Sequence, residues 1–352
     1  MSDLQLALLA IGALVVAGVY GYNVLQQRRL RRKTEQAFRD KPGDALFSTA
    51  PAQASAERIE PTLTQGETPP PATAPAPGGR GGPDPEVECV GEIRPAEPAA
   101  AEVLAPAFAR RAELGKPQRW FGLDAVSGQW VELQPGAAGR FTAFRGALQL
   151  ADRAGAASAV TLGQFRDLVN TLARDLGAEA RLPDPEAEQA RAARLDAFCA
   201  EVDVMMVVNA VSRDGAAFPG TKVRALAEAA GFKLEPDGVF RFRDEEGTHL
   251  FSLCNQEEAP FYPDAVKSLS TRGLTFFLEL PRVQSGERAF DRMVTIARGF
   301  CGTLGAMLVD DNRVPLNEPG IERIRAQLRA LGNKMESGGV APGGPRAMRL
   351  FS

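Results

Sequence analysis

Hydrophobic residues fill the start of the chain almost without interruption and later return with the periods of helices and strands. From Leu4 to Leu25 the sequence carries no charge, and nearly every residue is apolar. A helix of about 20 such residues crosses the hydrocarbon core of a bilayer. The pattern therefore predicts a transmembrane helix over residues 4–25.

The charge at the two ends of this segment predicts its orientation. A basic flank from Arg28 to Lys33 follows it, and only three residues, one of them acidic, precede it. Positive charge stays on the cytoplasmic side of a membrane, whereas a cleaved signal peptide carries its positive charge before the apolar run. We expect an uncleaved single-pass anchor with its short N-terminus outside, a basic juxtamembrane segment over 26–41, and cytoplasmic C-terminal domains.

Small residues recur along the anchor at Ala13, Ala17 and Gly21. This spacing places them on one helix face, where small residues let two helices approach closely. The pattern is compatible with weak self-association in the membrane. The high frequency of Ala and Gly in the whole chain is the simpler explanation.

Residues 42–85 have a different composition. They are rich in Pro, Ala, Thr and Gly and poor in aromatic residues. Such a segment cannot bury enough apolar surface to offset the entropy that is lost on ordering. We expect a disordered linker.

Beyond the linker, residues 201–333 have the pattern of a compact α+β unit. Apolar strands, a hairpin over Val239–Leu253 and amphipathic helices, the last ending at Gly332, follow in the order β-α-β-β-β-α-β-α. In the strand "GLTFFLELP" side chains alternate between two faces, so Phe276 falls on one face and Phe277 on the other. The neighbours of Phe277 on its own face are Thr275 and Glu279. This predicts a mostly antiparallel sheet of the split βαβ type with helices covering one face.

Residues 86–200 repeat this order of elements. The hairpin "RWFGLDAVSGQWVEL" matches "VFRFRDEEGTHLFSL", and "QFRDLVNTLARDLGAEARLPD" matches "AFDRMVTIARGFCGTLGAMLVDD". We expect a first, diverged copy of the same α+β unit, with Gln149 near the position that Phe277 has in the second. A flexible tail is expected over 334–352.

No motif in the sequence indicates catalysis. The chain has one histidine, His249, and four cysteines that form no CxxC pair, which argues against a catalytic triad, a His-based metal site and a disulfide framework. The sequence lacks the P-loop, the GxSxG and HExxH motifs and the dinucleotide fingerprint. His249 and Asp203 are interpreted as surface residues. We expect no enzyme activity, no cofactor and no metal.

The charge balance argues against nucleic acid as a partner. RRM domains stack bases on the aromatic residues of an open sheet. However, the chain has a net charge of -3, and residues 201–335 hold 17 Lys and Arg against 19 Asp and Glu. Because affinity for nucleic acid needs a basic excess, an RRM-like RNA-binding module is a less favoured alternative.

Apolar residues remain on the face of the second sheet that no predicted helix covers. They are Met205, Val207, Val239, Cys254 and Phe277. Single exposed apolar residues are normal, whereas five on one face indicate a surface that binds a partner.

Several segments of the second unit together resemble a known family. In order, "MMVVNAVSRDG", "ALAEAAGF", "HLFSLCN", "RGLTFFLELP", "MLVDDNR" and "GIERIRAQL" are similar to the C-terminal domain of the bacterial cell-division protein ZipA. The anchor, basic flank and Pro-rich tether also match that family's plan, whereas the first unit lies where the family usually has only tether. The resemblance implies an adaptor in the inner membrane, with a periplasmic N-terminus, that tethers FtsZ at the midcell division site and supports Z-ring assembly and septum formation.

The resemblance also implies a binding site. In the family, the C-terminal tail of FtsZ lies across the open sheet face, held mainly by apolar contacts. By motif, the contacting residues here are Met205, Val207, Asp237, Val239, Cys254, Gln256, Thr275 and Phe277. The family often has Met where Asp237 and Gln256 stand and Lys where Glu258 stands, so we expect a shallower and more acidic groove.

The partner remains open at this point, because a membrane-anchored module of the same kind could bind a different peptide. The role of the first unit is a separate question. We expect it to be structural or to bind another partner, so that only the second unit binds FtsZ.

Overall fold

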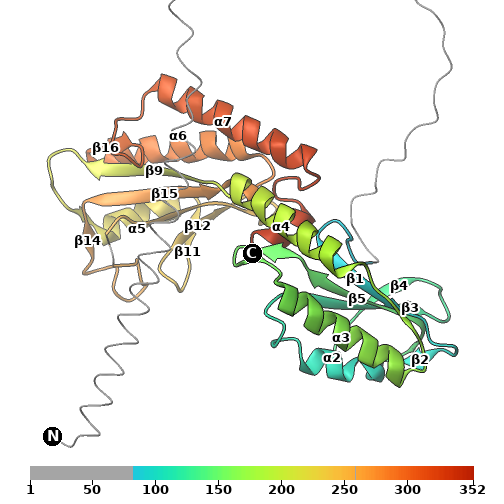
Figure 1. The fold of residues 1–352 in the computed structure, drawn as a ribbon. Helices are drawn as coiled ribbons and strands as arrows, with labels where there is room; N and C mark the ends of the chain where they lie inside the picture. The colour runs from blue at the N-terminus through green and yellow to red at the C-terminus, as the bar shows by residue number, and fades with distance from the viewer. Residues whose placement is uncertain (1–81, 258) are drawn as a thin grey trace, which may run out of the picture. The chain divides into compact units, whose positions relative to one another are not determined.

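The computed structural model describes residues 82–257 and 259–352 (Figure 1). The predicted transmembrane helix over 4–25, the basic segment over 26–41 and the linker up to residue 81 lie outside the described residues. Among the residues that are described, no helix is both long enough and apolar enough to cross a bilayer. The predicted α+β class with antiparallel sheets is confirmed.

The first unit runs from β1 to α4 and is built around one sheet with the strand order β4-β3-β5-β1-β8. Its helix α3 packs against β1 and β5, and Trp120, Phe144 and Phe165 lie in the resulting core. The elements are β1 (Glu88–Ile93), β2 (Ala99–Ala100), η1 (Ala101–Leu104), α2 (Ala105–Ala109), β3 (Gln118–Asp124), β4 (Trp130–Leu133), β5 (Arg140–Gln149), β6 (Ala151–Asp152), β7 (Gly155–Ala156), α3 (Ala159–Asp175), β8 (Ala180–Arg181) and α4 (Pro185–Val202).

The second unit runs from β9 to α7, and its sheet has the order β11-β12-β13-β15-β9-β16. Every pairing in it is antiparallel. The elements are β9 (Met205–Ser212), β10 (Phe218–Pro219), α5 (Gly220–Ala229), β11 (Phe232–Leu234), β12 (Phe240–Arg243), β13 (His249–Asn255), β14 (Ser270–Thr271), β15 (Gly273–Glu279), η2 (Leu280–Arg282), α6 (Gly286–Leu304), β16 (Ala306–Val309) and α7 (Glu318–Ser337).

Three strands have the same order in both sheets, and one hairpin is reversed. The order β5-β1-β8 in the first sheet corresponds to β15-β9-β16 in the second. The first unit joins its hairpin to β5 through β3, the earlier strand, whereas the second joins its hairpin to β15 through β13, the later strand. The two units therefore have similar element orders, but the second sheet has the additional strand β11, and the hairpin is inserted differently.

Aromatic side chains on one face of the second sheet form its core. The Phe232 ring lies at 5.4–6.5 Å from four others, including those of Phe276 and Phe300. Helices α5, α6 and α7 all contribute residues to this cluster. Helix α6 supplies an apolar stripe and ends at Gly305, which takes the left-handed conformation at φ 71° that a residue with a Cβ rarely adopts.

The segment expected to be a flexible tail, residues 334–352, is folded in the structure. Helix α7 continues past Gly332 to Ser337, because Met335 is buried, and a further helix α8 (Pro345–Leu350) follows. Phe351 packs with Val87 in a third apolar cluster that also holds side chains from α4. The prediction was wrong because these apolar residues are covered by distant parts of the chain.

Two carboxylates at the beginning of the described chain are held by arginines from its end. Asp84 accepts two hydrogen bonds from Arg346, from Nε at 2.7 Å and from Nη2 at 2.9 Å. It accepts a third from Arg349 at 3.0 Å. Glu88, only 2% exposed, accepts one bond from Arg349 at 3.0 Å and two from Arg119 at 2.9 and 2.8 Å. These bonds fix α8 to the first strand of the first unit.

Substituting Asp84→Asn tests this junction, because it removes the charge from a partly buried site and leaves Arg346 without its counterion. Hydrogen bonds to charged groups contribute about 1.5–3 kcal/mol each in such settings, so we expect a loss of about that size in the free energy of unfolding. Urea unfolding followed by tryptophan fluorescence measures it, since Trp120 lies in the core of the first unit. The control Glu228→Gln disrupts the exposed pair with Arg224 and should cost less than about 0.5 kcal/mol. Equal effects would contradict the assignment.

The effect of Asp84→Asn on the free energy of unfolding should also depend on pH. Burial by itself raises the pKa of Asp84, but the hydrogen bonds and charge of Arg346 outweigh it and hold the pKa below its ordinary value of 3.8. A carboxylate with a depressed folded pKa stabilises fully above its unfolded pKa and loses that contribution as the pH falls through the folded value. The stability difference between wild type and Asp84→Asn should therefore narrow below pH 3.8. A difference that stays constant there would contradict the ion pair.

Candidate functional site

The surface of the second sheet opposite the aromatic core is called the open face here. Cross-strand register places Phe277 between Ser252 and Val207, and Thr275 between Cys254 and Asn209. None of these side chains belongs to the apolar core cluster. Neighbouring strands therefore bring a small set of apolar and polar groups together on one surface.

Five of the eight predicted contact residues lie on adjacent strands of this face. Met205 is 52% exposed, and Val207, Cys254, Thr275 and Phe277 are partly exposed. A sixth residue, Val239, stands directly before β12 and is also partly exposed. The apolar patch predicted from strand alternation is thus contiguous in space.

The two remaining predicted residues lie beyond the strand ends and are engaged locally. Asp237 sits in a turn and its carboxylate accepts two bonds from Arg241, at 3.1 and 2.6 Å. Gln256 follows β13, and its side chain fills the space where a Cβ at Gly273 would stand. Side-chain contact of either residue with a ligand would first need these local interactions to change. The side chain at 258 is outside the described set.

Thr275 has a structural partner that explains its polarity. Its hydroxyl donates to Asn209 Oδ1 at 2.7 Å, and Asn209, 4% exposed, donates from Nδ2 to the carbonyl of Asp310 at 3.4 Å. Buried polar groups need such partners, because an unpaired group costs about 1–3 kcal/mol. Thr275 thus stabilises the sheet through its hydrogen bond, and the apolar surface of this face comes from the neighbouring residues.

Sequence reasoning missed the polar part of the open face. His249 Nε2 lies 2.8 Å from the hydroxyl of Ser252. Burial lowers the pKa of His249, and the charges of Arg241 and Arg243 lower it further, so the ring is neutral at pH 7. A register irregularity after Phe242 accompanies this contact, and sequence periodicity does not reveal it.

A second missed group lies where β15 ends. Glu279 pairs in register with Met205 and binds Arg153 of the first unit at 2.7 Å. Arg153 also binds Asp203, which the sequence predicts to be a surface residue, at 2.9 and 3.1 Å. The sequence separation of Arg153 from its partners hides this cluster from any local pattern.

The titratable groups of the face do not form a reactive site. Burial raises the pKa of the Cys254 thiol, so it is protonated at neutral pH and contributes a small apolar surface rather than a nucleophile. Among the described residues, no group of three or more His, Cys, Asp or Glu side chains is arranged to hold a metal ion. The arrangement is suited to non-covalent binding of an apolar segment.

The corresponding face of the first unit is filled by its own side chains. Arg145 lies over the Trp130 ring at 4.1 Å, and Arg119 lies over the Phe121 ring at 5.0 Å. Phe121 is consequently only 2% exposed. Ion pairs from these arginines to acidic residues of β1 and β4 complete the cover.

The expected position of Gln149 needs correction. Gln149 pairs with Glu88 at the end of β1, and its side chain is buried, donating to the carbonyls of Ala151 and Arg349 at 2.8 and 3.0 Å. Aligning β1 with β9 places Ala147, fully buried, where the second unit has Phe277. The first unit therefore lacks the aromatic side chain of the second.

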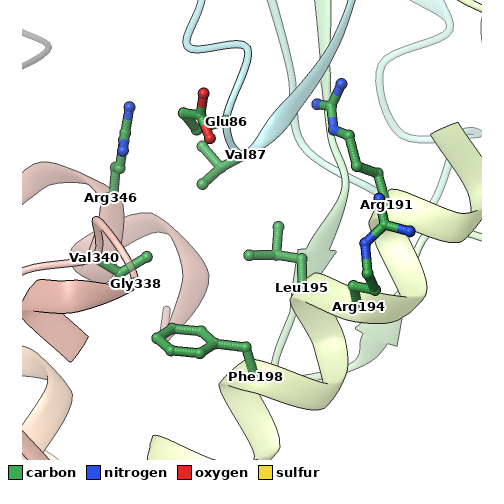
Figure 2. A pocket seen from close by; sticks show the side chains of 9 residues that line it. All are labelled: Glu86, Val87, Arg191, Arg194, Leu195, Phe198, Gly338, Val340 and Arg346. Atoms are coloured by element: carbon green, nitrogen blue, oxygen red, sulfur yellow. The ribbon is translucent and has the colours of Figure 1, made fainter. Parts of the chain in front are cut away.

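A pocket of about 220 Å³ lies where the segments before β1 and after α7 meet α4 (Figure 2), and none of its lining residues belongs to the open face. Three arginines line it together with apolar residues of α4 and of the segment after α7. Arg191 binds Glu188 at 2.6 Å and Arg346 binds Asp84 at 2.7 Å, so two of the three are already paired. The pocket belongs to the junction rather than to the candidate site.

These features define a class of protein. An antiparallel sheet with helices on one face and a partly apolar, partly exposed surface on the other is the architecture of a binding module that can hold a peptide segment.

Comparison with known proteins shows what the second unit is similar to. Residues 204–327 match the family described as ZipA, C-terminal FtsZ-binding domain, which confirms the resemblance for that segment. Proteins named Cell division protein ZipA are 32% identical over 149 residues in Ectopseudomonas mendocina and 30% identical over 141 residues in Marinobacter nauticus. These matches cover 41% and 39% of this chain and 55% and 42% of the relatives. The chain therefore spans about half the length of the curated relatives it matches.

Truncating the two adjacent phenylalanines of β15 tests the partition between the faces. Phe276→Ala should cost about 3–5 kcal/mol in unfolding free energy, because Phe276 is fully buried among aromatic rings. Phe277→Ala should cost about 1–2 kcal/mol or less, since its ring is only partly buried. Urea unfolding followed by far-UV circular dichroism compares them. Equal losses, or the reverse order, would contradict the assignment of faces.

Proposed function

We propose that this chain is a non-catalytic adaptor that links FtsZ filaments to the bacterial inner membrane. Its second unit binds the C-terminal tail of FtsZ on the open face, and its N-terminal segment anchors the chain in the bilayer. The match of residues 204–327 to the FtsZ-binding domain family is the observation that supports this most strongly.

The chemistry of the open face supports a peptide as the ligand. Met205, Val207 and Phe277 offer apolar surface that water contacts in the free protein. Covering apolar surface is favourable by roughly 25 cal/mol per Å², so three partly exposed side chains supply a modest affinity. Tethering to a polymer makes modest contacts effective, because many copies bind one filament together.

The N-terminal part of the chain completes this proposal. The predicted span over 4–25 is followed by the basic residues from Arg28 to Lys33, which favour a cytoplasmic location for the units. The predicted linker over 42–85 separates the span from the binding module. Such a protein is a single-pass inner-membrane protein with a periplasmic N-terminus, and it acts at the midcell division site in Z-ring assembly and septum formation.

We further propose that only the second unit uses its open face for the FtsZ tail. In the first unit, arginines already lie on the aromatic rings of the corresponding face. Ala147 takes the place of Phe277 there, so the anchoring ring is also missing. The two units are then a diverged pair, in which the first has a structural role and the second binds the FtsZ tail.

A titration with a fluorescent peptide of the FtsZ C-terminal tail tests this function, using the full-length chain in nanodiscs. Phe277→Ala should weaken binding about tenfold or more, as expected for a central aromatic contact. Trp130→Ala is the matched control, since it truncates an aromatic residue on the corresponding face of the first unit, and should leave the affinity unchanged.

Two outcomes would contradict the proposal. Absence of peptide binding by the wild-type chain would rule out the adaptor function. Binding that is lost with Trp130→Ala but kept with Phe277→Ala would show that the first unit, not the second, binds the tail.

A further inference from the structure

The end of the open face that carries Met205 and Glu279 is bordered by the first unit. Glu279 is the last residue of β15, and its carboxylate accepts a hydrogen bond from Nη1 of Arg153 at 2.7 Å. Arg153 lies in the turn between β6 and β7, 126 residues earlier in the chain. Part of the border of the face thus comes from outside the segment, 204–327, that matches the known family.

Arg153 is held in a fixed position. Asp203 accepts hydrogen bonds from its Nε and Nη2 at 3.1 and 2.9 Å, and Nη1 donates to Glu279. The turn that carries Arg153 is itself fixed by the buried Lys116, which binds Asp152 and donates to the carbonyl of Gly155 at 2.6 Å. The guanidinium group is therefore presented to the face by a rigid element of the first unit.

Hydrogen-bonding capacity remains on this guanidinium group. Arginine has five N–H donors, and the three bonds to Asp203 and Glu279 use three of them. The side chain is 32% exposed, and the neighbouring Met205 is 52% exposed. A segment that crosses Met205 would come within reach of the remaining donors.

The charges around this position are balanced, so they do not repel an acidic partner group. Arg153 and Arg282 together balance Asp203 and Glu279, with Arg282 Nε at 3.8 Å from Glu279. A ligand carboxylate would therefore meet a neutral border that offers free donors. Without Arg153, the same carboxylate would meet Asp203 and Glu279 with only Arg282 nearby to balance them.

We propose that Arg153 determines specificity at the FtsZ-tail site by donating hydrogen bonds to a carboxylate of the bound segment at the Met205 end of the face. This inference rests on the proposed function. It makes the first unit a part of the binding site, although the open face itself belongs to the second.

A peptide titration with the full-length chain in nanodiscs tests the proposal. Arg153→Ala should weaken binding of the fluorescent FtsZ tail peptide about five- to tenfold, as expected for the loss of a charge-assisted hydrogen bond. Arg110→Ala is the control, because Arg110 lies in the first unit and its one ion pair is an exposed contact with Glu113. It should leave the affinity unchanged.

A second set of peptides separates direct contact from support of the fold. In these peptides each acidic residue of the tail is replaced in turn by its amide. One replacement should weaken binding to the wild type at least threefold. The same replacement should have no effect on binding to Arg153→Ala, because the guanidinium group that contacts the carboxylate is already absent there.

Each result decides a different claim. If Arg153→Ala binds every peptide as wild type does, or weakens all of them equally, Arg153 makes no direct contact and the inference is wrong. If the wild-type chain binds no tail peptide at all, the proposed function fails first, and the inference fails with it.

Discussion

Side chains on a β-strand alternate between two faces, and the described helices of the second unit pack on one of those faces. The whole arrangement of the candidate site depends on this constraint. Phe276 must join the aromatic core beneath α6, so its neighbour Phe277 must point the other way. The same rule on β9 buries Met206 and leaves Met205 exposed. The proposed binding surface is therefore a direct consequence of how the core is formed.

The first unit obeys the same constraint with a different outcome. Its strands also alternate, but small residues and arginines occupy the face that lies opposite its core. Arg145 on Trp130 and Arg119 on Phe121 cover the rings that would otherwise be exposed. One element order thus gives a closed, internally paired surface in one copy and an accessible apolar surface in the other. The junction at Asp84 and the contact of Arg153 with Glu279 hold the two copies together.

Local periodicity predicted the long elements and the two faces of the second sheet, because both depend on near neighbours in sequence, but it missed the short edge strand β11. The predicted strand "GLTFFLELP" and the apolar stripe of α6 are present as expected. The prediction of a flexible tail over 334–352 was wrong, since the Gly and Pro residues there resemble a linker, whereas the cluster that holds Phe351 also includes Val87, Cys199 and Val202, more than 100 positions away. The Arg153 cluster and the buried position of Gln149 escaped prediction for the same reason. Both involve contacts between residues far apart in the sequence, which leave no periodic pattern.

The central claim is that the open face of the second unit holds the FtsZ tail. The most direct measurement is a two-dimensional amide NMR spectrum of the chain, recorded with and without the tail peptide. The account predicts that the largest shifts map to β9, β13 and β15, around Val207, Cys254 and Phe277. Shifts concentrated on the sheet of the first unit, or on the outer surfaces of α6 and α7, would contradict it.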